Sequence, residues 1–325
     1  MPKQALSLGK YRGLQQIARD GIFTILALDH RESLRKLLDP QDPERIGYGE
    51  LAEFKVAVAR ALTPHASAFL TDVTYGVPQV IGQDALPGQA GLLVTIEESG
   101  YLGPAHARRA RLVEGWSVEK IRRVGASAVK LLLYYHPQAE AAPQQEALLR
   151  QVAADCRAYD IPLVLEVLTY SPDPAVKADS AGYAATRPWV VAESARRLCP
   201  LGVDAFKAEF PADMRFEKDE GRLLRACEDV TEAAGVPWMV LSAAVDHDTF
   251  CRQVRLACRG GASGFLAGRS IWKEAGALRG EERAQFLAGE ATRRLTELSQ
   301  IAHAHARPWG EWYAADVDDR WWQRY

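Results

Sequence analysis

The sequence predicts an α/β protein in which eight parallel strands close into a single (β/α)8, or TIM, barrel. Eight short apolar runs recur along the 325 residues, with segments of helical periodicity between them. Several runs are almost continuously apolar, which is typical of parallel strands covered on both faces. Eight is also the number of strands that closes such a barrel. We expect residues 1–325 to form one domain, with a helix before the first strand and a Trp-rich C-terminal extension.

The eight apolar runs each have the length of a strand. They are FTILALD (23–29), SAFLTDV (67–73), GLLVTIE (91–97), AVKLLLY (128–134), PLVLEVL (162–168), AFKAEF (205–210), WMVLSA (238–243) and GFLAG (264–268). Strands that alternate with helices favour a parallel sheet with right-handed crossovers. The alternative is an open doubly wound sheet, whose dinucleotide-binding form needs a Gly-rich turn after the first strand. That strand runs into Asp29-His30-Arg31 without a glycine, which favours the barrel.

Amphipathic segments between the runs predict helices. We expect them at Glu50–Leu62, Ser117–Val124, Gln144–Tyr159, Trp189–Leu198, Asp246–Arg259 and Glu281–Ala302. Ser117 and Asp246 are predicted N-caps, and Gly260-Gly261 ends the helix that starts at Asp246. The connection Tyr170–Arg187 is the most irregular. We expect a loop there, which acts either as a lid over the site or as a plain connection.

The C-terminal stretch from Pro308 is rich in tryptophan. It contains Trp309, Trp312, Trp321 and Trp322. Four indole rings in so short a segment are costly to leave in water. We therefore expect this stretch to pack on the barrel or on a second subunit, and we expect a homo-oligomer.

The composition excludes several classes of partner. The net charge is −2, so no broad basic field is available for nucleic acid or an anionic membrane. The five cysteines form no C-x-x-C pair and no zinc-finger spacing. No apolar run has signal-peptide or membrane-span length. We expect reduced thiols, a cytoplasmic location, no membrane and no nucleic acid, with a small-molecule sugar phosphate as the partner.

Charged residues recur where the predicted strands end, which is where barrel enzymes place their chemistry. They are Asp29, Asp72, Glu97-Glu98, Lys130, Glu166, Lys207 with Glu209, and Arg269. A charge inside an apolar strand is costly unless it is paired or functional. A ring of such residues on successive strands predicts an active site.

Lys207 is the most informative member of this ring. Side chains alternate along a strand, so Lys207 faces the barrel mouth while Phe206 faces the helices. A neutral lysine amine adds to a ketone, and the resulting iminium draws electrons from the adjacent C–C bond. The pKa of the Lys207 amine must therefore fall well below its ordinary value of ~10.4. A nearby positive charge lowers the pKa of a lysine, and Lys130 is the candidate for that charge. The alternative is that both lysines are structural partners of Glu166 and Glu209.

Other strand ends supply candidates for proton transfer and anion binding. Glu166 either shuttles protons beside the imine or forms a buried salt bridge. Asp29 orients Lys207, binds a substrate hydroxyl or has a structural role. The turn after the last strand, with Gly268 and Arg269, predicts a phosphate site, to which Ser242 adds a hydroxyl. Here the alternative is a tight turn with a solvated arginine.

The histidines give no metal-ligand set. Only three lie near strand ends, namely His30, His136 and His247. His303 and His305 form one H-x-H pair, which we place after the last helix and at the surface. A metal enzyme of this kind needs two or three histidines, or histidine with carboxylates. We expect no metal and no cofactor.

Eight sequence motifs of the chain, taken together and in this order, are specific enough to identify a protein family. They are LALDHR (26–31), LTPHASAFLTDVTYGVP (62–78), GLLVTIEESGY (91–101), GASAVKLLLYY (125–135), IPLVLEVLTY (161–170), GVDAFKAEFP (202–211), WMVLSAAVD (238–246) and GASGFLAGRSIW (261–272). From about Gly21 to Trp309 the chain resembles the tagatose-1,6-bisphosphate aldolase family, whose relatives include sulfofructose-phosphate aldolases.

The resemblance implies a metal-free class I aldolase. It implies cleavage of a ketose bisphosphate, best matched by D-tagatose 1,6-bisphosphate, to dihydroxyacetone phosphate and an aldehyde such as glyceraldehyde 3-phosphate. Lys207 would form the Schiff base and Glu166 would be the acid/base, with Lys130 and Asp29 in the same site. Ser242 and Arg269, beside Gly268, would bind the phosphate of the dihydroxyacetone phosphate half. We also expect His30 and Arg31 to be substrate- or phosphate-binding residues.

Three positions depart from the family's pattern. His30 and then Arg31 follow Asp29, where Asp-Gln-Arg is common; Ala244 stands in place of glycine; and Glu98 stands where lysine is usual. His30 and Glu98 change contacts to the sugar or its distal anion. Three alternatives therefore stay open. They are the same chemistry on 6-deoxy-6-sulfofructose 1-phosphate, a non-catalytic sugar-phosphate-binding regulatory barrel, and a metal-dependent isomerase.

Overall fold

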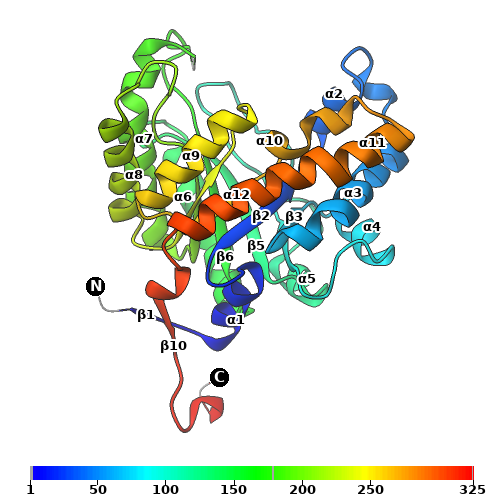
Figure 1. Ribbon diagram of the computed structural model, residues 1–325. Coiled ribbons are helices and arrows are strands. Elements are labelled where there is room, and N and C mark those ends of the chain that lie inside the picture. The colour runs from blue at the N-terminus through cyan, green and yellow to red at the C-terminus, as the bar shows by residue number, and fades with distance from the viewer. Residues whose placement is uncertain (1–2, 178, 324) are drawn as a thin grey trace.

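The computed structural model describes residues 3–177, 179–323 and 325, and its centre is a closed barrel of eight parallel strands (Figure 1). The barrel strands are β2 (Phe23–Leu28), β3 (Ala68–Thr71), β4 (Gly91–Thr95), β5 (Ala128–Tyr135), β6 (Leu163–Thr169), β7 (Ala205–Glu209), β8 (Trp238–Leu241) and β9 (Gly264–Ala267). They pair in chain order, and β9 pairs with β2 to close the ring. The predicted fold is confirmed, and each strand lies within two residues of its predicted ends.

Helices surround the barrel and connect successive strands (Figure 1). They are α1 (Leu8–Ile17), α2 (Glu32–Leu38), α3 (Tyr48–Leu62), α4 (Val77–Gly82), α5 (Val118–Arg123), α6 (Ala142–Ala158), α7 (Ala181–Leu198), α8 (Glu220–Ala234), α9 (His247–Arg259), α10 (Arg269–Trp272), α11 (Gly280–Phe286) and α12 (Thr292–His305). Both predicted caps are present: Ser117 accepts from the backbone N–H of Lys120, and Asp246 accepts from that of Thr249.

Two local predictions were wrong. The predicted loop Tyr170–Arg187 ends earlier, because α7 begins at Ala181 with Ser180 as its N-cap. Pro188 lies inside this helix, where it removes one backbone hydrogen bond. Because a proline usually marks the start of a helix, the sequence did not indicate the helical turns before Pro188. His303 and His305 do not follow the last helix but lie in the final turn of α12, although both are exposed as expected.

The C-terminal extension packs only in part on the barrel. Strand β10 (Tyr313–Ala315) pairs in parallel with β1 (Gln4–Leu6), away from the barrel sheet. Trp309 and Trp312 are buried, whereas Trp322 is 59% exposed and Trp321 is 36% exposed. Packing of the last two rings on a second subunit stays a prediction. None of the helices in the described ranges is long and apolar enough to span a membrane.

The barrel strands are buried along most of their length and place their functional polar groups near their carboxyl ends. Every residue of β2, β3 and β4 is buried, and so are the residues in the first part of β5, β6 and β7. The polar atoms that these strands carry meet at the carboxyl ends, where side chains from neighbouring strands face the same cavity. Lys130, Glu166 and Lys207 lie within paired strands, so their relative positions are fixed by the sheet register.

Candidate active site

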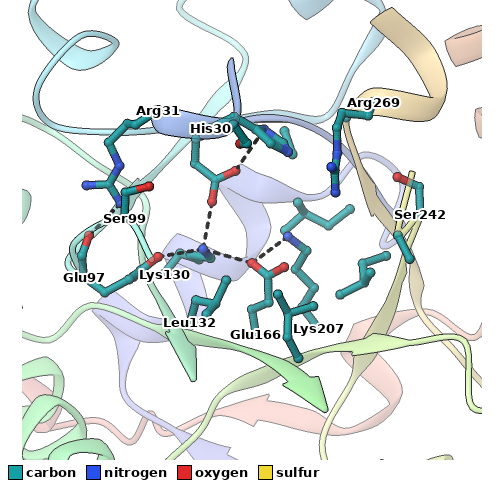
Figure 2. Close-up of a pocket in the computed structure, with 18 of the residues that line it drawn as sticks. His30, Arg31, Glu97, Ser99, Lys130, Leu132, Glu166, Lys207, Ser242 and Arg269 are labelled. Carbon is teal, nitrogen blue, oxygen red and sulfur yellow. Dashed lines mark hydrogen bonds and ion pairs between the residues drawn. The ribbon is translucent and has the colours of Figure 1, made fainter. Parts of the chain in front are cut away.

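A cavity of about 280 Å³ opens at the carboxyl ends of the strands (Figure 2). It is lined by all nine residues that the sequence places in the site, namely Asp29, His30, Arg31, Lys130, Glu166, Lys207, Ser242, Gly268 and Arg269. These residues are contributed by six of the barrel strands and the turns that follow them. The structure therefore brings together every member of the predicted set, although the role of each stays a prediction.

Lys207 lies in the middle of β7 and points into the cavity, as its parity predicted. Its side chain is buried, and its Nζ lies 2.8 Å from Oε2 of Glu166. The two residues are direct register partners on the adjacent strands β6 and β7. The next residue back along the chain, Phe206, is fully buried and does not line the cavity. The amine and the carboxylate are thus held together by the sheet itself.

Lys130 is the centre of the charge cluster. Its Nζ lies 2.7 Å from Asp29, 2.7 Å from Glu97 and 2.9 Å from Glu166, and its side chain is 1% exposed. Burial alone would lower the pKa of Lys130, but the three carboxylates raise it well above its usual range. Lys130 therefore stays protonated at neutral pH, and Glu166 bridges two lysines (Figure 2).

The same cluster fixes the charge of two carboxylates. Burial would raise the pKa values of Asp29 and Glu166, but the ammonium groups of Lys130 and Lys207 outweigh it. The pKa of Asp29 falls well below its usual range, and that of Glu166 also falls. Both groups are carboxylates at neutral pH. Glu166 is therefore in the form that can accept a proton from a neighbouring donor.

His30 is neutral in the folded protein. Burial, which outweighs the attraction of Asp29, lowers its pKa to about 3, and the positive charge of Arg269 also lowers it. The imidazole packs edge-on against Trp272, with ring centroids 5.3 Å apart. Its Nδ1 lies 3.7 Å from the Asp29 carboxylate. His30 thus lines the cavity as an uncharged ring rather than as a cation.

Two arginines face the cavity without a carboxylate partner among the described residues. Arg31 is 8% exposed and donates from Nη2 to the backbone oxygen of Glu97, while its Nε has no partner there. Arg269 is partly buried, and burial lowers its pKa. Figure 2 shows the two guanidinium groups on opposite sides of the Lys130–Glu166 pair. The cavity can therefore hold two anionic groups, one at each side.

The strand ends on the Arg269 side have unusual backbone geometry. Ser242 follows β8 and is buried, and the next two residues, Ala243 and Ala244, have φ angles of 45° and 62°. Such left-handed conformations favour glycine. At the end of the neighbouring strand β9, a Cβ on Gly268 would lie 2.4 Å from the backbone oxygen of Ala27. Glycine is therefore required at position 268 for packing against β2.

Some charged residues of the predicted ring lie outside the cavity. Asp72 turns away and pairs with Lys55 of α3 at 2.7 Å, and both side chains are fully buried. Glu209 does not pair with either site lysine, because it accepts from Thr169 and pairs with Arg187 at 3.4 Å. The structural alternative, which paired the lysines with both Glu166 and Glu209, is therefore wrong for Glu209.

Lys55 is a residue that the sequence analysis missed. Its Nζ donates to the backbone oxygens of Leu28 and His30, each at 2.7 Å. It thereby holds the chain on both sides of Asp29. The only signal in the sequence was a lysine between Phe54 and Val56 on the apolar face of a predicted helix. A long aliphatic side chain there reads equally well as a surface lysine.

Comparisons with known proteins agree on one group of enzymes. A family model described as DeoC/LacD family aldolase matches residues 23–274. Tagatose 1,6-diphosphate aldolase 2 of Streptococcus pyogenes serotype M6 is 30% identical to this chain, and the alignment covers 94% of this chain and 98% of that protein. Tagatose 1,6-diphosphate aldolase of Listeria monocytogenes serovar 1/2a is 31% identical, with 96% and 97% covered.

Solved structures share the fold at lower identity. An archaeal fructose 1,6-bisphosphate aldolase is 21% identical, with a TM-score of 0.61 over 90% of this chain and 98% of that chain. A Schiff-base-forming fructose-1,6-bisphosphate aldolase is 20% identical, with a TM-score of 0.59 and the same coverage. These likenesses show the barrel fold alone.

Proposed function

The chain belongs to the DeoC/LacD family of aldolases, and from that membership we propose that it cleaves a ketose phosphate through a Schiff base on Lys207. The family makes it a carbon–carbon lyase. The observation that carries the Schiff-base proposal is the contact between the buried Lys207 amine and the Glu166 carboxylate, 2.8 Å apart. That contact supplies a nucleophile and a base on the floor of one cavity.

The first half of the reaction forms the iminium. Glu166 accepts a proton from Lys207, and the freed amine attacks C2 of the ketose. Glu166 gives its proton to the resulting alkoxide and takes one from the positively charged nitrogen, which leaves a neutral carbinolamine. Glu166 then returns the proton to the departing hydroxyl, which leaves as water. Lys130 keeps its charge throughout, because its three carboxylate contacts stabilise the ammonium form. It offsets the negative charge of the cluster while Lys207 is neutral.

The second half breaks the C3–C4 bond. Glu166, again a carboxylate, takes the proton of the C4 hydroxyl, and the electrons of the C3–C4 bond move into the iminium. An aldehyde leaves and an enamine remains on Lys207. Glu166 gives its proton to C3, and water hydrolyses the iminium to dihydroxyacetone phosphate. One carboxylate in contact with the lysine thus performs each proton transfer in turn.

The two arginines support a substrate with an anion at each end. Arg269, with Ser242, binds the phosphate of the dihydroxyacetone phosphate half. Arg31 binds the distal anion, because it is buried, charged and free of a carboxylate partner among the described residues. The relatives from S. pyogenes and L. monocytogenes are named as tagatose 1,6-diphosphate aldolases. We therefore propose D-tagatose 1,6-bisphosphate as the substrate.

Glu98 favours a second candidate, 6-deoxy-6-sulfofructose 1-phosphate. Glu98 lines the cavity on the Arg31 side and is paired with Arg111, so this position lacks the positive charge of the lysine that the family resemblance implies there. A phosphate ester carries about −1.5 to −2 charges near pH 7. A sulfonate carries one. If the cavity is less positive on the Arg31 side, it favours a sulfonate there over a phosphate, because the sulfonate carries less negative charge.

The substrate is tested by measuring release of dihydroxyacetone phosphate from a panel of ketose 1-phosphates. The panel holds D-tagatose 1,6-bisphosphate, D-fructose 1,6-bisphosphate and 6-deoxy-6-sulfofructose 1-phosphate, each assayed with and without EDTA. We expect the highest kcat/KM for the tagatose ester and no effect of EDTA. A preference for the sulfonate supports the second candidate, and loss of activity with EDTA at an unchanged Tm and circular dichroism spectrum contradicts the metal-free mechanism.

A further inference from the structure

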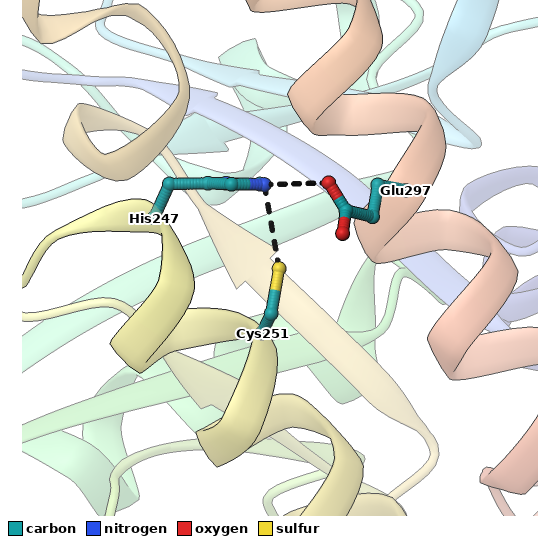
Figure 3. A group of neighbouring side chains, drawn as sticks. All are labelled: His247, Cys251 and Glu297. Atoms are coloured by element: carbon teal, nitrogen blue, oxygen red, sulfur yellow. Dashed lines mark hydrogen bonds and ion pairs between the residues drawn. The ribbon is translucent and has the colours of Figure 1, made fainter.

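Three potential metal ligands converge outside the catalytic cavity, between α9 and α12 (Figure 3). His247 is the first residue of α9, Cys251 follows one helical turn later, and Glu297 lies on α12. His247 Nε2 lies 3.0 Å from Glu297 Oε2 and 3.4 Å from Cys251 Sγ. His247 is 9% exposed and Cys251 is 8% exposed, so two of the three side chains are withdrawn from solvent.

An ordinary two-centre hydrogen bond accounts for only one of the two contacts of His247 Nε2. One ring nitrogen carries either one proton or one lone pair, so His247 Nε2 can hold both neighbours only by sharing that proton in a weaker three-centre bond. A nucleophilic Cys–His–Glu relay is also excluded, since it needs the carboxylate on the ring nitrogen remote from the thiol. Both neighbours of His247 meet the same nitrogen, and Nδ1 has no partner among the described residues.

Tetrahedral coordination accounts for both contacts. Zinc binds imidazole nitrogen at about 2.0–2.1 Å, thiolate at about 2.3 Å and carboxylate oxygen at about 2.0–2.2 Å. Around one tetrahedral ion these bond lengths place nitrogen and oxygen about 3.3 Å apart, and nitrogen and sulfur about 3.5 Å apart. The observed separations are 3.0 Å and 3.4 Å. The two separations at His247 Nε2 therefore differ from the tetrahedral values by no more than a few tenths of an ångström, and all three ligand atoms lie within 4.8 Å of one another.

We propose that His247, Cys251 and Glu297 bind one divalent cation of the zinc class, with water as the fourth ligand. Binding replaces the thiol proton of Cys251, which passes to solvent, by a metal–sulfur bond. Of the three ligands, His247 lines a surface cleft, which connects that side of the site with solvent. Arg293 donates at 3.0 Å to the same Glu297 oxygen, Oε2, that faces His247, so this oxygen serves the arginine as well as the ion.

The bound ion would tie a loop of the catalytic cavity to the outer helix. Ser242 and the left-handed Ala243 and Ala244 lead directly into His247. A metal that joins His247 to Glu297 fixes the end of that loop against α12. Its role is therefore structural, and the proposal does not depend on the Schiff-base mechanism, because metal binding is measured without substrate.

The test is a titration of the reduced, metal-free protein with Co²⁺, followed by competition with Zn²⁺. We expect one ion per chain, a thiolate-to-cobalt charge-transfer band that Zn²⁺ removes, and a higher Tm with Zn²⁺. The Cys251→Ser and His247→Ala variants should lose the band. Two matched controls should keep it: Cys258→Ser, which changes another buried thiol of α9, and the double variant His303→Ala/His305→Ala, which removes the exposed histidines of α12.

Circular dichroism shows whether each variant is folded. If Cys251→Ser and His247→Ala do not fold, Glu297→Gln decides, because this side chain is 44% exposed and its loss leaves the packing of both helices intact. We expect Glu297→Gln to weaken Zn²⁺ binding by about tenfold or more. The proposal is overturned if the folded wild-type protein gives no thiolate–cobalt band, if Cys251→Ser retains it, or if Glu297→Gln binds Zn²⁺ as tightly as the wild type.

Discussion

Lys207 and Glu166 are register partners on adjacent strands, and the amine of one lies 2.8 Å from the carboxylate of the other. Their contact is set by the pairing of β6 with β7, so it needs no loop closure to form. The mechanism follows from this pairing, because the nucleophile and the group that moves its protons are held on one rigid surface. Lys130, from β5, completes the arrangement by contacting the same oxygen at 2.9 Å.

Replacing the proposed proton carrier should slow the chemistry without changing the fold. In Glu166→Gln the amide still fills the space but cannot accept the Lys207 proton. We expect kcat to fall by about 10²- to 10⁴-fold, with a circular dichroism spectrum like that of the wild type. The matched control is Glu146→Gln on α6, which lies outside the cavity and should leave kcat unchanged. A Glu166→Gln variant with normal kcat would remove Glu166 from the mechanism.

Lys130→Met should destabilise the protein as well as inactivate it. The variant leaves Asp29, Glu97 and Glu166 buried without their shared cation. Breaking a buried ion pair on one side costs about 3–5 kcal/mol, which urea unfolding would measure. Lys10→Met provides the comparison, because it breaks the buried Lys10–Asp204 pair outside the cavity. That variant should lose stability but keep its kcat, whereas unchanged stability in Lys130→Met would contradict the cluster.

The fold could be predicted from the sequence more completely than the side-chain contacts of the site, and the reason is physical. Strands are visible in the sequence because apolar runs are local, and site residues such as Lys207 follow from strand parity. Pairing is not local: Lys130 collects three carboxylates because of strand register and side-chain reach, which no single segment reveals. Lys55 was missed for the same reason, since its partners lie on β2 and after β3.

Relief of backbone strain near Ser242 should stabilise the protein. Ala244 has a φ of 62°, and a left-handed conformation costs a residue with a Cβ about 1–2 kcal/mol. Ala244→Gly should therefore raise the free energy of unfolding by about 1 kcal/mol, net of the entropy that glycine adds to the unfolded chain. The opposite sign is expected for Ala154→Gly on the exposed face of α6, where glycine costs about 1 kcal/mol. A loss of stability in Ala244→Gly would show that the strain is absent.

His30 should make stability depend on pH in the acid range. Its folded pKa of about 3 lies below the unfolded value of about 6.5. The unfolded chain therefore binds the proton first, so this stability is fully present above pH ~6.5 and is lost as the pH falls toward ~3. Between these values we expect a slope of up to about 1.4 kcal/mol per pH unit.

The variant His30→Gln should remove that part of the pH dependence, because glutamine does not titrate. Urea unfolding of both proteins at several pH values between 7 and 4 measures the difference in slope. His305→Gln is the control, since His305 is exposed and should leave the slope unchanged. Equal slopes in the wild type and His30→Gln would mean that His30 is protonated as easily in the folded chain as in the unfolded one.

The Schiff base itself is tested by trapping. Borohydride reduction of the enzyme during turnover of D-tagatose 1,6-bisphosphate, followed by peptide mass spectrometry, identifies the lysine that carries the sugar. We expect one adduct per chain, on the peptide that contains Lys207, and none in folded Lys207→Ala, which should also lack turnover. An adduct on another lysine, or continued turnover without any adduct, would contradict the account.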